Sequence, residues 1–401
     1  MKKIAKILAM FAIFALAFSF AGCKSDDSDS SDDDVTISGG STSGNGSSNG
    51  SSSGSNTSGG GNSGNTSDNT SGGSSSGGSD TGDSSGSGSE SGSTTGGTTS
   101  GGGSESGSTG GTTSGGGSGS GSTGGSSSGS TEQVSEVFVK IPAVSIDGTE
   151  SWTPSSEVFV SGRNLKIASF YMSDHEVTRG EYKAVMGSDP SKAAAYDKDG
   201  KKLAGDDNVK NNPVNCISWY DALVYCNTRS IKENLTPCYA IGGKTDPSEW
   251  GSVPTKSNST WNAATCDFEV DGYRLPTEAE WEWAARGSKD YTTYAGSKDI
   301  DEVAWYTVNT NDTGTRDVKT KKANGYGLYD MSGNVWEWCW DWYGNLSSST
   351  ASSGLISGSN RCLRGGSWGK NADAALIADR GNYRPYYPSY TYGFRLVRNA
   401  N

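Results

Sequence analysis

The sequence is poor in the groups that most enzymes use for proton transfer: its 401 residues include a single histidine, His175. A nucleophile–base–acid triad requires a general base, so no serine triad can be argued without a second histidine. Within Asp174-His175-Glu176 we interpret the lone histidine as a packing or surface residue rather than a metal ligand. The chain also lacks a long basic run and has a formal net charge of -12, which argues against a nucleic-acid partner.

The N-terminus lacks an apolar stretch long enough to span a bilayer. A lysine-rich start precedes an apolar run over residues 7–20, which is shorter than the roughly 20 residues of a membrane-spanning helix. We therefore predict a signal peptide over residues 1–22. The small residues before Cys23 resemble a lipobox, which predicts that Cys23 is lipidated and anchors an exported protein to the membrane of the cell envelope, at the outer-membrane surface. The alternative is an ordinary signal peptide that is cleaved elsewhere.

Residues 24–131 lack aromatic side chains and have Val35 and Ile37 as their only large apolar residues. The rest of this segment is almost entirely Gly, Ser, Thr, Asn and Asp, a composition that cannot bury enough surface to offset the entropy of ordering. We predict that residues 23–131 form a lipidated cysteine and a disordered tether. The tether either lifts a folded domain away from the lipid surface or serves as a plain solubilising spacer.

Residues 132–401 have the composition of a folded domain, and all 12 tryptophans lie there. Export permits disulfides, and we predict one between Cys238 and Cys266, which flank one long loop. A pair between Cys339 and Cys362 is a weaker alternative, and the helical pattern around Cys226 predicts a buried thiol.

Local patterns predict an α+β fold with little regular secondary structure. Alternating or continuous apolar residues indicate strands over 137–141, 158–160 and 165–171. Ser or Thr followed three residues later by Asp or Glu predicts helices over 179–186, 219–229 and from 278 to the stop at Gly287. The last third has neither period and predicts short strands joined by long loops.

Four blocks of the predicted domain resemble the formylglycine-generating enzyme (sulfatase-modifying factor) family in order and spacing. The blocks are Asn212–Ala222, Gly272–Glu282, Gly325–Trp338, and Arg364–Trp368 with Gly393–Arg395. The resemblance implies the formylglycine-generating type of the C-type lectin fold. We expect Arg274, Glu280 and Arg395 to be members of buried ion pairs, and Gly365 and Gly366 to allow a tight backbone path.

The resemblance also identifies a missing reaction centre. Active members of the family carry two cysteines after the Gly-Gly-Ser-aromatic run, which bind copper(I) and oxidise a substrate cysteine. Lys370 and Ala375 occupy the matching positions here, and neither side chain offers a thiolate for a soft metal. We therefore expect no copper and no catalytic residues of the family type.

The block from Asp330 to Glu337 matches the calcium-binding turn of the family. By resemblance the ligands would be the Asp330 carboxylate, the Gly333 and Val335 carbonyls and the Glu337 carboxylate, a set of hard oxygen ligands suited to Ca²⁺. The spacing alone is not specific, since Asp330 could simply cap a turn.

The segment between Lys370 and Tyr392 has the composition of a binding surface, because Tyr offers a large rigid contact area at low entropic cost. In the family fold this stretch lines the substrate groove, and it resembles the segment varied in lectin-fold proteins diversified by retroelements. Alternatively, the tyrosines pack a wide loop. The candidate ligand-binding residues are Lys370, Asn371, Asp373, Asp379, Asn382, Tyr383, Arg384, Tyr386, Tyr387, Tyr390 and Tyr392.

These observations together predict a non-catalytic, surface-displayed lipoprotein that binds a protein or glycan ligand and is a candidate for retroelement diversification. The alternatives are an oxidoreductase of the formylglycine-generating type with a non-standard centre, and a purely structural envelope protein.

Overall fold

The computed structural model describes residues 132–287 and 292–400, where the predicted domain lies. The predicted signal peptide, Cys23 and the tether over residues 24–131 lie outside the described residues. Within the described part of the chain, none of the helices combines the length and the apolar character needed to cross a bilayer.

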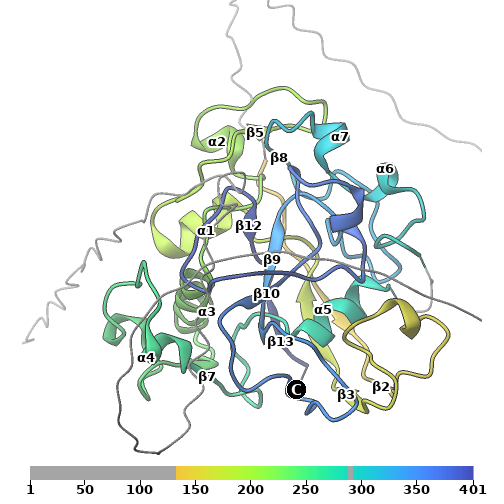
Figure 1. The fold of residues 1–401 in the computed structure, drawn as a ribbon. Coiled ribbons are helices and arrows are strands. Elements are labelled where there is room, and N and C mark those ends of the chain that lie inside the picture. The colour runs from red at the N-terminus through yellow and green to blue at the C-terminus, as the bar shows by residue number, and fades with distance from the viewer. Residues whose placement is uncertain (1–131, 288–291, 401) are drawn as a thin grey trace, which may run out of the picture. The chain divides into compact units, whose positions relative to one another are not determined.

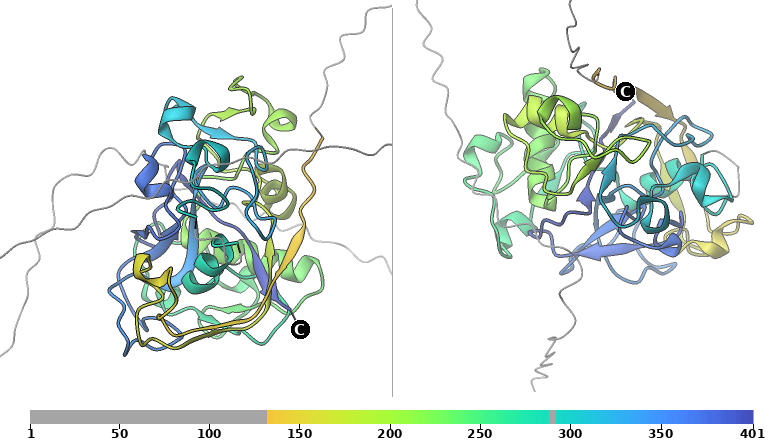
Figure 2. Two further views of the ribbon diagram at one scale, coloured as in Figure 1. Left: turned by 90° about the vertical axis from the view of Figure 1, so that its right-hand side faces the viewer. Right: turned by 90° about the horizontal axis from the view of Figure 1, so that it is seen from above.

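A three-stranded antiparallel sheet joins the start and the end of the domain. Its order is β1 (Phe138–Ile141), β4 (Phe170–Ser173) and β13 (Val397–Asn399), with β4 in the centre. Met172 of β4 is opposite Val139 on one side and Val397 on the other. The first and last strands of the domain therefore lie on either side of one strand (Figure 2).

A four-stranded sheet runs through the middle of the domain and supports the C-terminal loops. Its order is β11 (Gly381–Tyr383), β10 (Arg361–Arg364), β9 (Trp336–Trp342) and β12 (Tyr392–Gly393). The β9–β10 and β10–β11 pairs are antiparallel, whereas β12 is parallel to β9. Consequently the chain between β11 and β12 passes from one edge of this sheet to the other (Figure 1).

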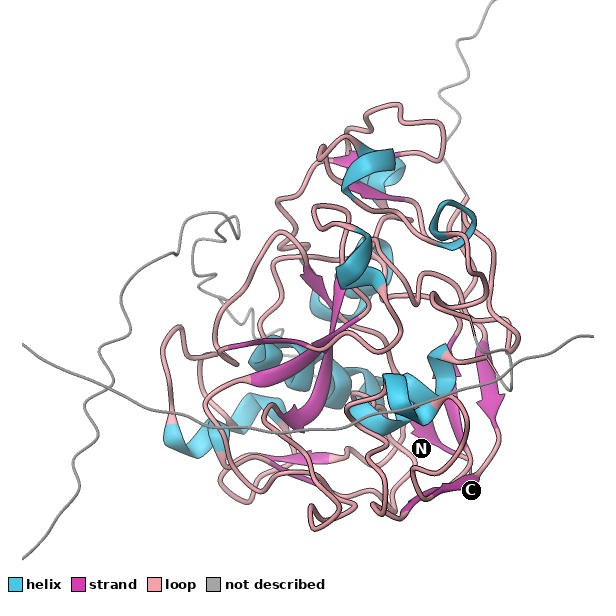
Figure 3. Cartoon of the chain, turned by 45° about the vertical axis from the view of Figure 1, so that its right-hand side comes forward, coloured by secondary structure: helices cyan, strands magenta, loops and turns pink. Residues whose placement is uncertain are grey.

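The remaining elements are short, and loops make up most of the drawn chain (Figure 3). The two-stranded pairs are β2 (Val144–Ile146) with β3 (Leu165–Ile167), β5 (Ala195–Tyr196) with β8 (Thr315–Arg316), and β6 (Tyr239–Ala240) with β7 (Thr265–Cys266). The short helices are η2 (Thr153–Ser155), α2 (Asp206–Val209), η3 (Pro247–Glu249), α4 (Ser259–Asn262), α6 (Ile300–Val303), α7 (Thr307–Thr310) and η4 (Ala372–Ala375). The predicted α+β class with little regular structure is confirmed.

The three longest helices begin at capping boxes, two of which were predicted from Thr178 and Thr277, while at Ser218 only the helix start and the position of Asp221 in its first turn were predicted. They are α1 (Arg179–Met186), α3 (Trp219–Lys232) and α5 (Glu278–Ala285), capped by Thr178, Ser218 and Thr277 respectively. In each helix the cap side chain accepts from the third backbone N–H, while the third side chain accepts from the cap N–H. Helix α3 extends to Lys232, beyond the predicted end at 229.

Two strand predictions need correction. Residues 158–160 form a bend rather than a strand, although Val158 and Phe159 are buried as their apolar character demands. The predicted strand over 165–171 is two strands, β3 and β4, which belong to different sheets. Burial explains the apolar run in both places, but only the tertiary pairing decides which residues form a ladder.

Two apolar clusters form the core, one around α3 and the other around α5. Trp219 and Trp338 are completely buried in the first, and each indole donates to a backbone carbonyl of the other's segment: Trp219 to Cys339 at 3.0 Å, and Trp338 to Ile217 at 2.8 Å. These bonds satisfy the polar atom of each buried ring. They fasten the start of α3 to β9.

The predicted disulfide between Cys238 and Cys266 is not formed, because both residues are free thiols. In the β6–β7 ladder Cys266 is opposite Tyr239 rather than Cys238. Neighbouring ladder positions direct their side chains to opposite faces, so this register separates the two sulfurs. The weaker pair is also absent: Cys339 and Cys362 are free and buried, and Cys226 is the buried thiol predicted from its helix.

Helix α5 is the centre of a buried network of ion pairs. Glu280 pairs with Arg274 at 2.7 Å, and Glu278 pairs with Arg364 at 3.0 Å and with Arg380 at 2.7 Å. The expected burial of Arg274 and Glu280 as an ion pair is therefore confirmed.

The same helix also contacts Arg286 directly and Arg395 through Glu337. Glu282 pairs with Arg364 at 2.9 Å and also with Arg286. Trp281 Nε1 donates to Glu337 at 2.7 Å, and the same carboxylate pairs with Arg395. Arg395 is thus a buried ion-pair member, as expected.

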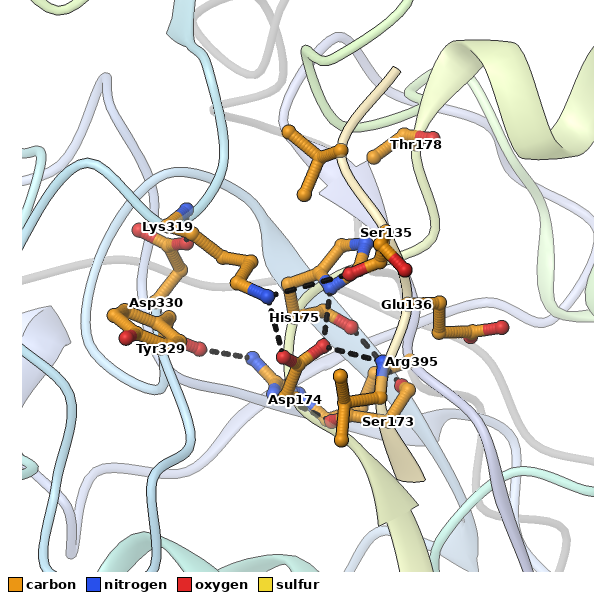
Figure 4. Close-up of polar contacts among 12 residues, drawn as sticks. Ser135, Glu136, Ser173, Asp174, His175, Thr178, Lys319, Tyr329, Asp330 and Arg395 are labelled. Atoms are coloured by element: carbon orange, nitrogen blue, oxygen red, sulfur yellow. Dashed lines mark hydrogen bonds and ion pairs between the residues drawn. The ribbon is translucent and has the colours of Figure 1, made fainter. Parts of the chain in front are cut away.

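A polar cluster holds the first described residues against the domain (Figure 4). Lys319 Nζ donates to the Ser135 carbonyl at 3.3 Å and to Asp174 Oδ2 at 2.5 Å. Asp174 Oδ1 accepts from the Val137 backbone N–H at 3.2 Å and lies 2.5 Å from His175 Nδ1. His175 is therefore a packing residue inside this cluster, 1% exposed, as interpreted from the sequence.

This cluster predicts a loss of stability in alkali. Burial alone would lower the pKa of His175, but hydrogen bonds to Asp174 and Glu181 outweigh it and raise the pKa from 6.5 to about 9. The folded state therefore binds the proton more tightly, so the stabilisation is complete below the unfolded pKa and disappears as pH rises through 9.

We expect the thermal midpoint of the wild type to fall between pH 6 and pH 9.5 by more than that of His175→Gln, whose amide does not titrate. Circular dichroism melts of both proteins at the two pH values would measure the difference. An equal fall in the two proteins would contradict the assignment.

Candidate ligand-binding surface and metal loop

The loop from Gly365 to Ala375 is held in place by its backbone. Gly365 and Gly366 have φ of 91° and 77°, and a Cβ on Gly366 would lie 2.7 Å from the Ala374 carbonyl oxygen. The Lys370 carbonyl accepts from Thr307 N at 2.9 Å, and the Ala375 carbonyl accepts from the Ser332 hydroxyl at 2.8 Å. The tight path expected of the glycines is confirmed, and it fixes the backbone at Lys370 and Ala375.

The thiols nearest in sequence to this loop do not substitute for the pair. Cys339 and Cys362 are fully buried on β9 and β10. Burial is the largest cause that raises the pKa of each thiol well above 9.0. Both sulfurs are therefore protonated at neutral pH and shielded from solvent, which makes them poor ligands for copper(I).

The C-terminal loop over residues 384–391 lies across the start of helix α3. The Pro385 carbonyl accepts from Tyr220 N at 3.3 Å, and the Ser389 carbonyl accepts from Cys216 N at 2.8 Å. β11 and β12 fix the two ends of this loop at opposite edges of the sheet, and these two hydrogen bonds attach its middle to the domain.

The structure brings several of the predicted tyrosines together, but not all of them on the surface. The Tyr383 ring centroid is 4.7 Å from that of Tyr387 and 5.8 Å from that of Tyr392. Tyr392 is 5% exposed and packs edge-on against Trp338 at 5.3 Å. Tyr392 therefore belongs to the core, because its strand β12 pairs with β9 beneath the loop. The exposed side of the group comes from Tyr383, Tyr386 and Tyr387, which are half-buried.

The first half of the predicted segment lies against a different part of the domain. Asn371 and Asp373 are exposed, and Ala372 between them packs against the small cluster that contains Val303 and Tyr306. Lys370 is bonded to the start of α7 through Thr307. This half is thus supported by α6 and α7, whereas the tyrosines are supported by α3 and β9.

Two further predicted residues are directed toward the scaffold. Asn382 Oδ1 accepts from Asn360 Nδ2 at 2.7 Å on the β10–β11 side. Asp379 is half-buried, and burial raises the pKa of its carboxyl above 3.8 although Arg364 opposes that shift. The predicted set therefore divides into scaffold residues and two exposed groups, one around Asn371 and one around Arg384.

Trp368 bonds to both the C-terminal loop and helix α7, and it was not among the predicted residues. Its indole donates to the Tyr390 carbonyl at 3.4 Å, and its own carbonyl accepts from Thr310 at 2.7 Å. Val308 on α7 is 68% exposed and follows the residue bonded to Lys370. The sequence signal for this part of the surface was Val308, an apolar residue among the polar residues of α7, but the sequence does not place α7 beside the C-terminal loop.

The loop predicted to bind calcium contains one unused acidic oxygen. Asp330 is 2% exposed with φ of 55°, and its Oδ2 accepts from Lys319 N at 2.8 Å. Its Oδ1 is buried without a hydrogen-bond partner, and burial raises the pKa of this carboxyl to about 6. A buried oxygen without a donor is a feature that a cation would satisfy.

The other acidic ligand of the predicted set is already paired. Glu337 accepts from Arg395 Nε and Nη2, both at 2.7 Å, and from Trp281. Glu176 adds a third buried carboxylate, and burial, together with Asp330 and Glu337, raises its pKa well above 4.5. Asp330 is therefore the most available acidic ligand, because Glu337 is already paired and burial favours the neutral form of Glu176.

The lectin-like arrangement and the tight Gly-Gly turn define a domain of the formylglycine-generating type. The chain belongs to the family described as "Sulfatase-modifying factor enzyme 1-like domain", which it matches over residues 129–400.

Relatives within this family carry different names. The chain is 35% identical over 264 residues to "Chaperone protein LppX" of Paenibacillus barcinonensis, covering 61% of this chain and 85% of that protein. It is 35% identical to the formylglycine-generating enzyme of Streptomyces coelicolor over 35% of this chain and 52% of that enzyme, so the match spans about half of the enzyme's length. The solved structure "Treponema denticola variable protein 1" is 34% identical with a TM-score of 0.56, covering 65% of this chain and 94% of that one. These comparisons confirm the predicted family and fold.

Proposed function

We propose that this protein is a non-catalytic binding protein, displayed at the cell surface by a lipid on Cys23 and by the tether that follows. Its ligand would be a protein or a glycan, held by the exposed groups of the C-terminal loop and Trp368. The single observation that carries the proposal is the replacement of both copper-binding cysteines by Lys370 and Ala375 in an otherwise intact family loop.

The chemistry of the loop supports binding over oxidation. An ammonium and a methyl group cannot hold copper(I), and the buried thiols of Cys339 and Cys362 are too well shielded to replace them. The exposed residues around Arg384 and Asn371 instead combine aromatic area with hydrogen-bonding groups, which suits recognition. A relative named as a variable protein is consistent with a surface whose side chains change, as in retroelement-diversified proteins.

The competing proposal, an oxidoreductase with a non-standard centre, is tested with copper. We expect the purified chain to bind no copper(I) and to produce no formylglycine from a cysteine-containing sulfatase-type peptide in the presence of oxygen. The double variant Lys370→Cys/Ala375→Cys restores both family ligands and should gain about one equivalent of copper(I). Mass spectrometry of the peptide and titration of copper(I) are the measurements. Formylglycine from the wild type would overturn the proposal.

The binding surface is tested on glycan and peptide arrays. We expect Arg384→Ala/Tyr386→Ala/Tyr390→Ala to lose binding by roughly tenfold or more, because aromatic and arginine side chains dominate interface energies. Tyr392 is left intact because it belongs to the core.

The matched control is Lys140→Ala/Lys166→Ala, which removes two exposed side chains from β1 and β3. The control should bind like the wild type. Undiminished binding by the loop variant, with an unchanged melting temperature, would rule out this surface.

We also propose that Ca²⁺ binds the loop between Asp330 and Glu337, where it would brace the turn before β9. Asp330, Gly333, Val335 and Glu337 would hold the ion, which supplies positive charge to a site with surplus carboxylates. We expect EDTA to lower the thermal midpoint of the wild type and Ca²⁺ to restore it. Asp330→Asn should melt at the same temperature with and without Ca²⁺. A wild-type midpoint that ignores EDTA would count against the site.

A further inference from the structure

A hollow lies on the domain between the turn after β5 and helix α7, away from the tyrosine group. It encloses about 350 Å³. The β5–β8 pair and α7 appear close together in Figure 1, and their residues line the hollow. Tyr196, Trp305 and Arg316 form its deeper side, while Lys198, Asn311 and Thr313 form its exposed rim.

Arg316 is the residue that distinguishes this hollow. It is 4% exposed, and no carboxylate of the described residues lies within ion-pair distance of its guanidinium. Its Nη1 donates to the Gly314 carbonyl at 2.9 Å and to the Thr315 carbonyl at 3.4 Å, and its Nη2 donates to the Thr310 carbonyl at 3.2 Å and to the Thr313 hydroxyl at 3.4 Å. These bonds orient the group but leave its positive charge without a counter-ion.

Most other buried arginines of the domain are compensated differently. Arg274, Arg364 and Arg395 each pair with a buried glutamate. Arg361 has no such partner, but its guanidinium lies between the rings of Trp219 at 3.8 Å and Trp342 at 3.5 Å. Arg316 also stacks on aromatic rings, Tyr196 at 4.6 Å and Trp305 at 5.6 Å, yet it borders an open hollow.

We propose that this hollow binds the carboxylate of an acidic sugar. The carboxylate would pair with Arg316, a charge-assisted contact that is among the stronger polar interactions in proteins. The Asn311 amide at the rim suits sugar hydroxyls, and the edges of Tyr196 and Trp305 suit the ring. Lys198 at the rim would add a second positive charge, although it is shared with Asp199 at 2.8 Å.

This site is separate from the tyrosine group, although Thr310 in its lining donates to the Trp368 carbonyl at 2.7 Å. None of its lining residues belongs to the tyrosine group, and the charge that defines it comes from β8. Failure of the proposed binding surface would therefore leave this inference untouched, and the reverse also holds.

The test is titration of the full chain with glucuronate and, in parallel, with glucose and N-acetylglutamate. Binding is measured by isothermal titration calorimetry or ligand-detected NMR. We expect glucuronate to bind and glucose to bind at least tenfold more weakly. Arg316→Gln should weaken glucuronate by roughly tenfold or more, because it removes a charge-assisted contact. Lys140→Ala, which removes an exposed side chain from β1, should leave this affinity unchanged.

Since Arg316→Gln could also disturb the β5–β8 pair, a surface variant provides the second arm. Lys198→Glu places a negative charge at the exposed rim and should weaken glucuronate several-fold with an unchanged melting temperature. Lys166→Glu, the same charge change on β3, should have no effect. Equal binding of glucose and glucuronate, stronger binding of N-acetylglutamate, or indifference to both Arg316→Gln and Lys198→Glu would each overturn the proposal.

Discussion

The buried charges of helix α5 are the constraint on which the rest of the structure depends. In a domain made mostly of loops, sheet hydrogen bonds alone cannot fix the path of the chain. Glu280 pairs with Arg274, which precedes the helix in the chain. Glu278 and Glu282 both pair with Arg364, which follows it, and each pair is buried. Such pairs contribute less to net stability than to geometry, but removal of one partner costs about 3–5 kcal/mol because the other charge stays buried.

This arrangement separates the scaffold from the displayed surface. Arg364 immediately precedes the Gly-Gly turn, and Arg395 lies two residues after the end of β12, so the ion pairs fix both ends of the intervening loop. Side chains between these two points can change without disturbing the network, provided that Arg380, which pairs with Glu278, and core residues such as Tyr392 and Ala375 are kept. A loop with fixed ends and exchangeable side chains is a suitable scaffold for recognition.

The segment that contains Arg316 and Lys319 carries two positive charges with different surroundings. Lys319 occupies the left-handed region with φ of 61°, and from there it bonds both Asp174 and the first described residues. Arg316, three residues earlier, is buried by Tyr196 and Trp305 but lacks a carboxylate. One short segment therefore contains a satisfied cation that holds the N-terminal segment and an unsatisfied one that borders a hollow.

The sequence was most informative where a local pattern has one physical solution. The capping boxes at Thr178, Ser218 and Thr277 fixed the starts of the long helices, because the cap bonds involve residues three apart in the chain. Motif spacing identified the family, which the family match over residues 129–400 confirms. The sequence failed at 158–160, where an apolar run is buried without joining a ladder.

Contacts between distant segments were decided by the tertiary structure alone. The partners of Glu278 and the side on which Tyr392 lies depend on the order of strands in the central sheet, which no local pattern encodes. A one-residue offset between β6 and β7 separates Cys238 from Cys266, although their spacing in the chain had suggested a bridge. The sequence by itself determined which side chains stand at each position, such as Lys370 and Ala375 after the Gly-Gly turn, since folding does not change the chemistry of a side chain. The fold decided which of its tyrosines and arginines face solvent, because burial is a property of packing across the whole chain.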